Sequence, residues 1–132
     1  MRIGLLSDTH LPGIIQSLDE LGPEPANFFS TVDLIFHGGD LTSPKVLDWL
    51  ERFAPVVCAT GNNDSIVDPR SKEVQPLEVA GWRIGMVHSL DRQFRPVSEL
   101  QELFPEPVDI MVAGHTHLEQ LELRDGVVIM NC

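Results

Sequence analysis

The chain has 132 residues with a formal net charge of -11 at pH 7, and 42% of the residues are hydrophobic. This length and balance predict one soluble globular domain over residues 1–132. The acidic surplus argues against a nucleic-acid surface and against binding to an anionic membrane, because both need clustered Lys and Arg side chains.

Cysteine content and the length of the apolar runs indicate the compartment. Cys58 and Cys132 are too few for a disulfide framework, and we expect Cys58 to be buried in the core. No apolar run is long enough to span a membrane, and the first one is too short for a signal peptide. We therefore predict a cytoplasmic protein.

The N-terminal part of the chain predicts a strand followed by a helix. Residues 2–7 (RIGLLS) form a short, continuously apolar run, which is typical of a strand buried on both faces of its sheet. Residues 14–22 (IIQSLDELG) predict a helix from three apolar residues at helical spacing, Ile14, Leu18 and Leu21. Residues 21–25 (LGPEP) then indicate a turn.

The next segment repeats the strand and helix pattern. Residues 32–37 (VDLIFH) and 55–60 (PVVCAT) have the length and branching of buried strands. Between them, residues 43–53 (SPKVLDWLERF) give the clearest helical pattern, in which Ser43 can cap the N-terminus and Pro44 suits the first position. The apolar face of this helix would carry Val46, Leu47, Leu50 and Phe53.

The C-terminal half predicts two hairpins, one at either side of a further helix and strand. Residues 76–89 turn at Gly81, and residues 118–131 turn at Asp125-Gly126, a pair suited to a type I′ turn. Between the hairpins, a helix is predicted over residues 97–104 and a buried strand over residues 108–114. Strands that alternate with helices and are followed by hairpins predict an α/β layered domain.

Polar side chains that can bind metal ions follow these predicted strands directly. In chain order they are Asp8, His10, Asp40, Asn62, His88, His115 and His117. The carboxyl ends of strands in an open α/β sheet converge on one crevice, so segments far apart in sequence would deliver these groups to one place. Each motif alone is common turn chemistry, but their joint occurrence at strand ends favours a metal site.

The ligand types indicate which ions suit this site. Imidazole, carboxylate and amide groups without a thiolate suit Mn, Zn, Fe or Ni rather than Ca or Mg, and we favour Mn. The ligands are too many for one tetrahedral ion, whereas two ions sharing a bridging carboxylate would use them. A metal pair about 3.5–4 Å apart is the usual device for phosphoester displacement, and its local charge would attract a phosphate to an acidic protein.

Five motifs occur in a fixed order: D-x-H at 8–10, G-D at 39–40, G-N-x-D at 61–64, a lone His88, and G-H-x-H at 114–117. This ordered set, over Arg2 to Asn131, resembles that of the calcineurin-like metallophosphoesterases. The short spacing resembles their small stand-alone prokaryotic phosphodiesterase branch. The resemblance implies a two-sheet sandwich flanked by helices, with four layers in the order αββα.

The resemblance also implies a division of the ligands between two ions. One ion would be held by Asp8, His10, Asp40 and His117, and the other by Asp40, Asn62, His88 and His115, which makes Asp40 the bridge. Spacing alone does not divide His115 from His117. The implied protein is a dinuclear phosphodiesterase for a small phosphodiester or nucleotide-like substrate. A metal-bridging hydroxide would attack phosphorus directly, with Asp40, Asn62, Asn63 and His88 at the reacting centre.

The sequence departs from the family pattern in two places. Many relatives have a His where this chain has Asn63, which cannot act as a general acid, so we expect esters with good leaving groups to react much faster than alkyl esters. The chain also ends at Cys132, where relatives usually continue into a further strand. We expect a truncated or short member whose unpaired sheet edge favours homo-oligomers.

Two other functions stay open on the same fold. One is a non-catalytic scaffold, as the retromer subunit of this superfamily is, and the other is a phosphomonoesterase or nucleotidase. The retromer subunit lacks part of the metal set, whereas every ligand position is filled here, which favours an enzyme.

Several residues outside the ligand set also carry predictions. We expect His37 to be a hydrogen-bonded structural histidine and Asp64 to orient a ligand. Gly39, Gly61 and Gly114 would allow close backbone approach. We expect solvated charges at Arg70, Arg92 and Arg95 and packing roles for Trp49 and Trp82. Substrate selectivity would lie in residues 11–20, 65–75 and 89–98.

Overall fold

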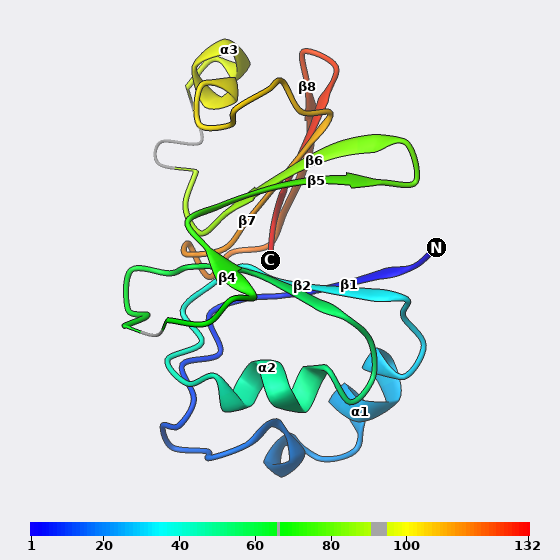
Figure 1. Cartoon of the computed structure of the whole chain (residues 1–132), viewed down its shortest axis with the longest axis vertical. Coiled ribbons are helices and arrows are strands. Elements are labelled where there is room, and N and C mark those ends of the chain that lie inside the picture. Colours follow the sequence, from blue (N-terminus) through cyan, green and yellow to red (C-terminus); the bar gives the residue numbers. More distant parts are fainter. Residues whose placement is uncertain (66, 91–94) are drawn as a thin grey trace.

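The computed structural model describes residues 1–65, 67–90 and 95–132, and within these residues two sheets lie face to face (Figure 1). The first sheet is entirely parallel and contains, in spatial order, β1 (Ile3–Leu6), β2 (Leu34–His37), β3 (Val56–Ala59) and β4 (Ser71–Lys72). The second sheet is mixed and has the order β5 (Val74–Val79), β6 (Trp82–Val87), β7 (Ile110–Ala113), β9 (Val127–Asn131) and β8 (Gln120–Arg124).

Helices cover the outer faces of both sheets, which gives four layers (Figure 1). A short 3-10 helix, η1 (Leu18–Leu21), lies with α1 (Glu24–Phe29) and α2 (Lys45–Leu50) against the first sheet, and α3 (Val97–Gln101) lies against the second. The predicted two-sheet αββα sandwich is therefore confirmed. Within the described ranges, no helix has both the length and the apolar character required for crossing a membrane.

The continuously apolar strands are explained by three separate layers of core. On β2, Ile35 packs into the cluster under the helices, while Phe36 packs into the cluster between the sheets. Cys58 and Ala59 on β3 divide in the same way. Successive side chains on a strand point to opposite faces, so a strand that is buried on both faces needs apolar residues at every position.

The predicted helix over residues 14–22 is wrong except for its last turn. Only Leu18–Leu21 is helical, and Ile14 is fully exposed. The Ser17 hydroxyl accepts a hydrogen bond from the backbone N–H of Asp19, which caps a turn that starts only at Leu18. Gly22, with a φ of 94°, then ends it in the left-handed region.

Helix boundaries elsewhere also differ from the predicted ones. α2 is shorter than residues 43–53, although Ser43 does accept a hydrogen bond from the N–H of Lys45 and its predicted apolar face is buried or packed against the core. α1 begins where the prolines of residues 21–25 predict a turn, because proline also suits the first turn of a helix. The fully buried Cys58 agrees with the prediction, and burial raises the pKa of its thiol to about 12.

Both predicted hairpins are confirmed. Ala80 and Gly81 have φ values of 52° and 83° between β5 and β6, and Asp125 and Gly126 have 50° and 79° between β8 and β9. Positive φ at both central residues is the requirement of a type I′ turn. The expected packing role is correct for Trp49, which is buried, and wrong for Trp82, which lies on the solvent-facing end of its hairpin with 57% of its surface exposed.

Candidate metal centre

The first two strands deliver their polar residues to the same place. β1 and β2 are parallel neighbours, so the loops that follow them run side by side. The N–H of Asp8 donates to the carbonyl of Gly39 at 2.9 Å, and the N–H of His10 donates to the carbonyl of Asp40 at 2.9 Å. These hydrogen bonds fix both predicted carboxylates at one edge of the first sheet.

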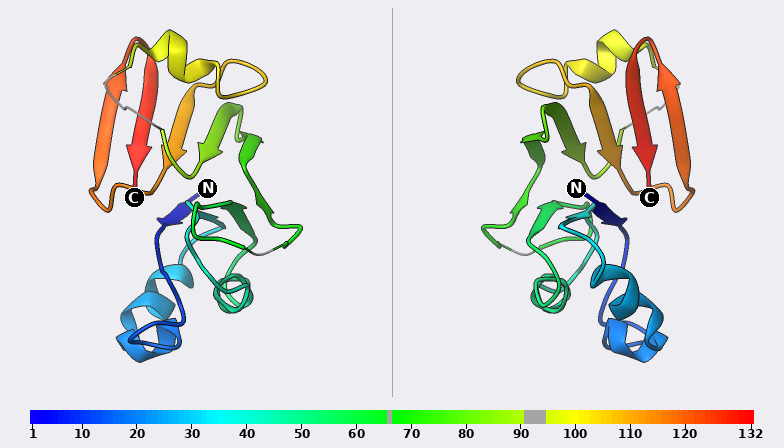
Figure 2. Two further views of the ribbon diagram at one scale, coloured as in Figure 1. Left: turned by 90° about the vertical axis from the view of Figure 1, so that its left-hand side faces the viewer. Right: turned by 90° about the vertical axis from the view of Figure 1, so that its right-hand side faces the viewer.

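The second sheet brings its histidines to the same edge. β6 and β7 are parallel, and Figure 2 shows the arrowheads of β7 and β9 at one end of this sheet. His88 follows β6 and His115 follows β7, and the N–H of Gly114 donates to the carbonyl of His88 at 2.9 Å. The N–H of His115 donates to Asp8 Oδ2 at 2.9 Å, which ties the two sheets together at the site.

The two carboxylates lie among the imidazole rings. Asp8 Oδ1 is 3.3 Å from His117 Nε2 and 3.9 Å from His10 Nε2. Asp40 Oδ2 is 3.6 Å from His10 Nε2 and 3.5 Å from His88 Nε2. Asp40 therefore has one oxygen between a histidine of the first sheet and a histidine of the second.

A second group of potential metal-binding atoms lies around His88. Its Nε2 lies 3.0 Å from Asn62 Oδ1 and 3.2 Å from His115 Nδ1. Its Nδ1 lies 2.8 Å from the carbonyl of Gly38, which can only accept, so we assign the proton to Nδ1 and the free lone pair to Nε2. The structure thus brings all seven predicted ligands to one region.

The chemistry of this donor set fits a cation. Asp8 Oδ1 is buried and has no hydrogen-bond donor among the described residues, whereas its Oδ2 accepts hydrogen bonds from Ser7 and His115. A buried carboxylate oxygen without a donor is costly unless a cation compensates it. Donor atoms of Asp8, His10 and His117, and those of Asp8, Asp40 and His88, lie within 4.8 Å of one another, which is close enough to share an ion.

Backbone strain is concentrated at the same residues. In the described chain, eight non-glycine residues have a positive φ, and two of these, Ala80 and Asp125, belong to hairpin turns. The other six lie at the site, with φ between 45° and 71°: Asp8, His10, Asp40, Thr42, His115 and His117. Such strain persists only where surrounding structure enforces it, and it clusters at functional sites.

Asp40 is held ionised by its neighbours. Burial alone would raise its pKa, but Asn63 donates its backbone N–H to Oδ1 at 2.8 Å and its side-chain amide to Oδ2 at 2.6 Å. These hydrogen bonds, with the nearby rings of His88 and His10, place the pKa of Asp40 below its ordinary value. Asn63, which was predicted at the reacting centre, therefore contacts the Asp40 carboxylate.

Asp64 acts on the loop that carries Asp40. Its carboxylate accepts hydrogen bonds from the backbone N–H groups of Asp40 at 2.9 Å, Gly61 at 2.8 Å and Thr42 at 2.8 Å. The close approach needs glycine at position 61, because a Cβ there would collide with the backbone of Asp40. This agrees with the prediction that Asp64 orients a ligand.

His37 is a buried, hydrogen-bonded histidine, as predicted. Its Nδ1 accepts the N–H of Gly39 at 3.1 Å, and its Nε2 lies 3.1 Å from Thr9 Oγ1. Burial lowers the pKa of His37 to about 4, although nearby carboxylates, Asp64 foremost, oppose the change. The ring is therefore neutral at pH 7 and braces the first two loops.

Asn131 supports the site, although the sequence pattern does not predict this role. It is buried near the end of β9, and its amide donates to Thr116 Oγ1 and to the carbonyl of Leu118, both at 2.8 Å. These bonds brace the loop that carries His115 and His117. The only sequence signal is an amide at the end of an apolar strand, next to a hairpin.

The predicted solvated arginines behave differently. Arg70 forms ion pairs with Asp68 at 2.6 Å, Glu51 at 2.8 Å and Asp48 at 2.9 Å, so the prediction of a solvated charge is wrong there. These partners fasten the segment after β3 to α2. Arg95 lies 3.8 Å from Glu99, and Arg92 falls outside the described residues.

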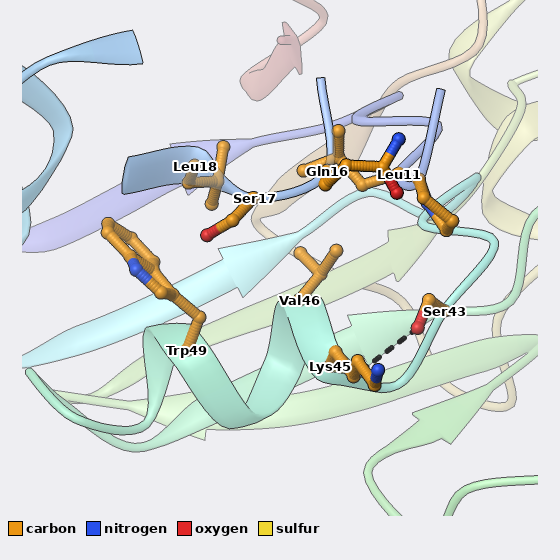
Figure 3. A pocket seen from close by; sticks show the side chains of 9 residues that line it. Leu11, Gln16, Ser17, Leu18, Ser43, Lys45, Val46 and Trp49 are labelled. Atoms are coloured by element: carbon orange, nitrogen blue, oxygen red, sulfur yellow. Dashed lines mark hydrogen bonds between the residues drawn. The ribbon is translucent and has the colours of Figure 1, made fainter. Parts of the chain in front are cut away.

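Two cavities adjoin the loops expected to set selectivity. One, of about 270 Å³, lies between residues 11–18 and α2, with Leu11, Leu18, Val46 and Trp49 as apolar walls and Ser17, Ser43 and Lys45 as polar ones (Figure 3). Another, of about 440 Å³, includes Asn62, His88 and His115 in its lining. Only the second is lined by predicted ligands.

The fold and the donor set are those of a candidate metal-binding α/β protein, and comparison with known proteins gives its family. Residues 1–132 match the calcineurin-like phosphoesterase superfamily domain. A probable metallophosphoesterase of Methanothermobacter thermautotrophicus is 35% identical over 138 residues, covering 99% of this chain and 75% of that protein. The chain therefore belongs to the calcineurin-like phosphoesterase superfamily.

Two further proteins are similar to the chain, one in sequence and one in structure. A phosphodiesterase of Methanocaldococcus jannaschii is 25% identical over 146 residues, covering 99% of this chain and 82% of that protein. The crystal structure of Vps29 from Entamoeba histolytica complexed with Zn²⁺ superimposes with a TM-score of 0.78 at 21% identity, covering 99% of this chain and 73% of that one. At this identity the second likeness shows the fold alone.

Proposed function

We propose that the protein is a phosphodiesterase that uses two divalent metal ions. The observation that carries this proposal is the convergence of carboxylate and imidazole donors from both sheets around an Asp8 oxygen that is buried without a hydrogen-bond donor. Asp8, His10, Asp40 and His117 would hold one ion, and Asp40, Asn62, His88 and His115 the other. The phosphodiesterase relative supports this reaction.

The bound ions would supply positive charge for a phosphoryl group and would lower the pKa of water. The residues of the chain prepare the site for them. Asn63 donates to the Asp40 carboxylate and lowers its pKa, while Asp64 holds the backbone N–H of Asp40 and so places this carboxylate between His10 and His88. The carbonyl of Gly38 holds the proton of His88 on Nδ1, so that Nε2 faces the site. Manganese suits these nitrogen and oxygen donors, and zinc, iron and nickel are alternatives.

The leaving group would receive no proton from Asn63. Its amide is bonded to Asp40 and has no acidic proton in the neutral range. A general acid typically contributes about 10²–10⁴-fold, so esters that need protonation of the leaving oxygen should suffer most. We expect methyl nitrophenyl phosphate to react at least about 100-fold faster than dimethyl phosphate. Equal rates would contradict this assignment.

A scaffold without catalysis is the second candidate, because the Vps29 structure shares the fold and carries zinc. Metal binding alone therefore does not separate the two functions. Turnover does.

The test uses Asp40→Asn, with Asp19→Asn as a matched control at an exposed position. Metal content and hydrolysis of bis-nitrophenyl phosphate are measured for each protein across manganese, zinc, iron and nickel. We expect two ions and turnover in the wild type and control, and loss of both in Asp40→Asn. Two bound ions without turnover in the wild type would favour the scaffold, and full activity of Asp40→Asn would overturn the bridging role.

A further inference from the structure

The cavity beside His88 is built where the chain crosses from one sheet to the other. β4 ends at Lys72 in the first sheet and β5 begins at Val74 in the second, so the chain crosses between the sheets at Glu73. Glu73 joins the proposed ligands Asn62, His88 and His115 in the lining of this 440 Å³ cavity. A group attached to a phosphate at the metal centre would therefore extend towards Glu73.

Glu73 carries the only carboxylate among the described residues that line this cavity. The remaining described lining residues are Thr60, Gly61, Val87 and Ser89, and none of the eight is Lys or Arg. Glu73 is exposed, and the described residues give its carboxylate no ion pair. An unpaired carboxylate acts on other charges within about 8–10 Å at physiological ionic strength.

We infer that Glu73 is a specificity-determining residue that makes the site select phosphodiesters with neutral or cationic substituents over phosphomonoesters. The inference rests on the proposed phosphodiesterase function and extends it to a substrate class. A monoester carries a second negative charge on its phosphate above its pKa of about 6, and the Glu73 carboxylate in the same cavity lining would repel that charge. A substituent with an ammonium group or hydroxyl donors would be attracted instead. Monoesters and nucleotides with further phosphates would be disfavoured.

The experiment compares binding of three alkyl phosphates to the manganese-loaded protein by line broadening in ³¹P NMR. Methyl phosphate is a dianion, dimethyl phosphate a monoanion, and glycerophosphocholine a diester with a cationic substituent. Glu73→Gln keeps the shape of the side chain and removes its charge. Glu78→Gln makes the same change on β5, outside this lining.

We expect Glu73→Gln to strengthen binding of methyl phosphate about threefold to tenfold and to weaken glycerophosphocholine about threefold, as expected for a screened unit charge. Dimethyl phosphate should change less than about twofold, Glu78→Gln should match the wild type, and 0.5 M salt should shrink the differences. Binding of all three probes without this charge-dependent pattern would overturn the role of Glu73 and leave the phosphodiesterase proposal intact. Failure of every protein to bind any probe would overturn both.

Discussion

The two halves of the candidate metal centre differ in how firmly the fold holds them. In the buried half, the side chains of Asp8, Asp40 and His88 are only 3–6% exposed, and backbone groups from several segments bond to them. In the exposed half, the side chains of His10 and His117 are 38% and 61% exposed. The fold thus fixes the carboxylates by burial, while these histidines are placed by the strained backbone that carries them.

This difference indicates how the site would load. Burial and hydrogen bonds hold the Asp8 and Asp40 carboxylates in place without metal. The exposed side chains of His10 and His117 can adopt several rotamers, and a bound ion would restrict them to one. The buried half should therefore depend on the global stability of the protein, and the exposed half on local bracing. Three predictions test this division.

The largest effect is expected from removing the Asp64 carboxylate, which supports the buried half. Asp64→Ala would leave three backbone N–H groups without their acceptor, and it should lower the free energy of unfolding by about 3–5 kcal/mol. Urea unfolding of the metal-free protein measures this loss. Asp19→Ala, at an exposed position, should change it by less than about 0.5 kcal/mol. A loss below about 1 kcal/mol for Asp64→Ala would show that this loop does not depend on Asp64.

The pH dependence of stability should reveal the buried His37. Its pKa is about 4 in the folded protein and 6.5 when exposed, so the unfolded chain binds more protons between these values. Stability should therefore fall as pH drops from 6.5 to 4, by about 3 kcal/mol in total. Asp40, whose pKa is lowered, contributes stability that is lost only at more acidic pH.

His37→Gln tests this sign, because glutamine does not titrate. Urea unfolding of the metal-free variant across the same pH range should give a flatter profile between pH 6.5 and 4 than the wild type gives. Parallel profiles for the two proteins would mean that folding does not change the pKa of His37.

The smallest effect concerns the exposed half. Asn131→Ala removes the two hydrogen bonds that the Asn131 side-chain amide donates to the loop of His115 and His117. This change should weaken metal affinity about tenfold, as is usual when a ligand loses its supporting hydrogen bonds. Calorimetric manganese titration should show both binding steps weakened, because His115 and His117 are proposed to hold different ions. Asn27→Ala on α1 is the matched control. Wild-type affinity in both steps would contradict the supporting role of Asn131.

The convergence of the proposed ligands could be predicted from the sequence because each of them follows an apolar strand. Parallel topology sends all such ends to one edge, so Asp8, Asp40 and His88 meet without any knowledge of side-chain packing. The four layers were predictable only through the family resemblance. Continuous apolar strands indicate burial on both faces, but they do not say whether helices or a second sheet cover them.

The supporting contacts could not be predicted because they depend on tertiary packing. Asn131 and Thr116 are 15 positions apart and meet only because β9 pairs with β7. The helix predicted over residues 14–22 is mostly absent for a related reason. The apolar spacing fits a helix, but the backbone N–H of Asp19 donates to the Ser17 hydroxyl, so the helical turn begins only at Leu18. The ion pairs of Arg70 could not be predicted because its acidic partners lie in α2, at the C-cap of α2 and in the loop of Arg70 itself.

Anomalous diffraction from a manganese-loaded crystal tests the central claim most directly. Two peaks should appear at this edge, one contacting Asp8, His10 and His117 and the other Asn62, His88 and His115, with Asp40 contacting both. A folded, loaded crystal with no peak among these residues, or with a single peak that Asp40 does not contact, would contradict the account.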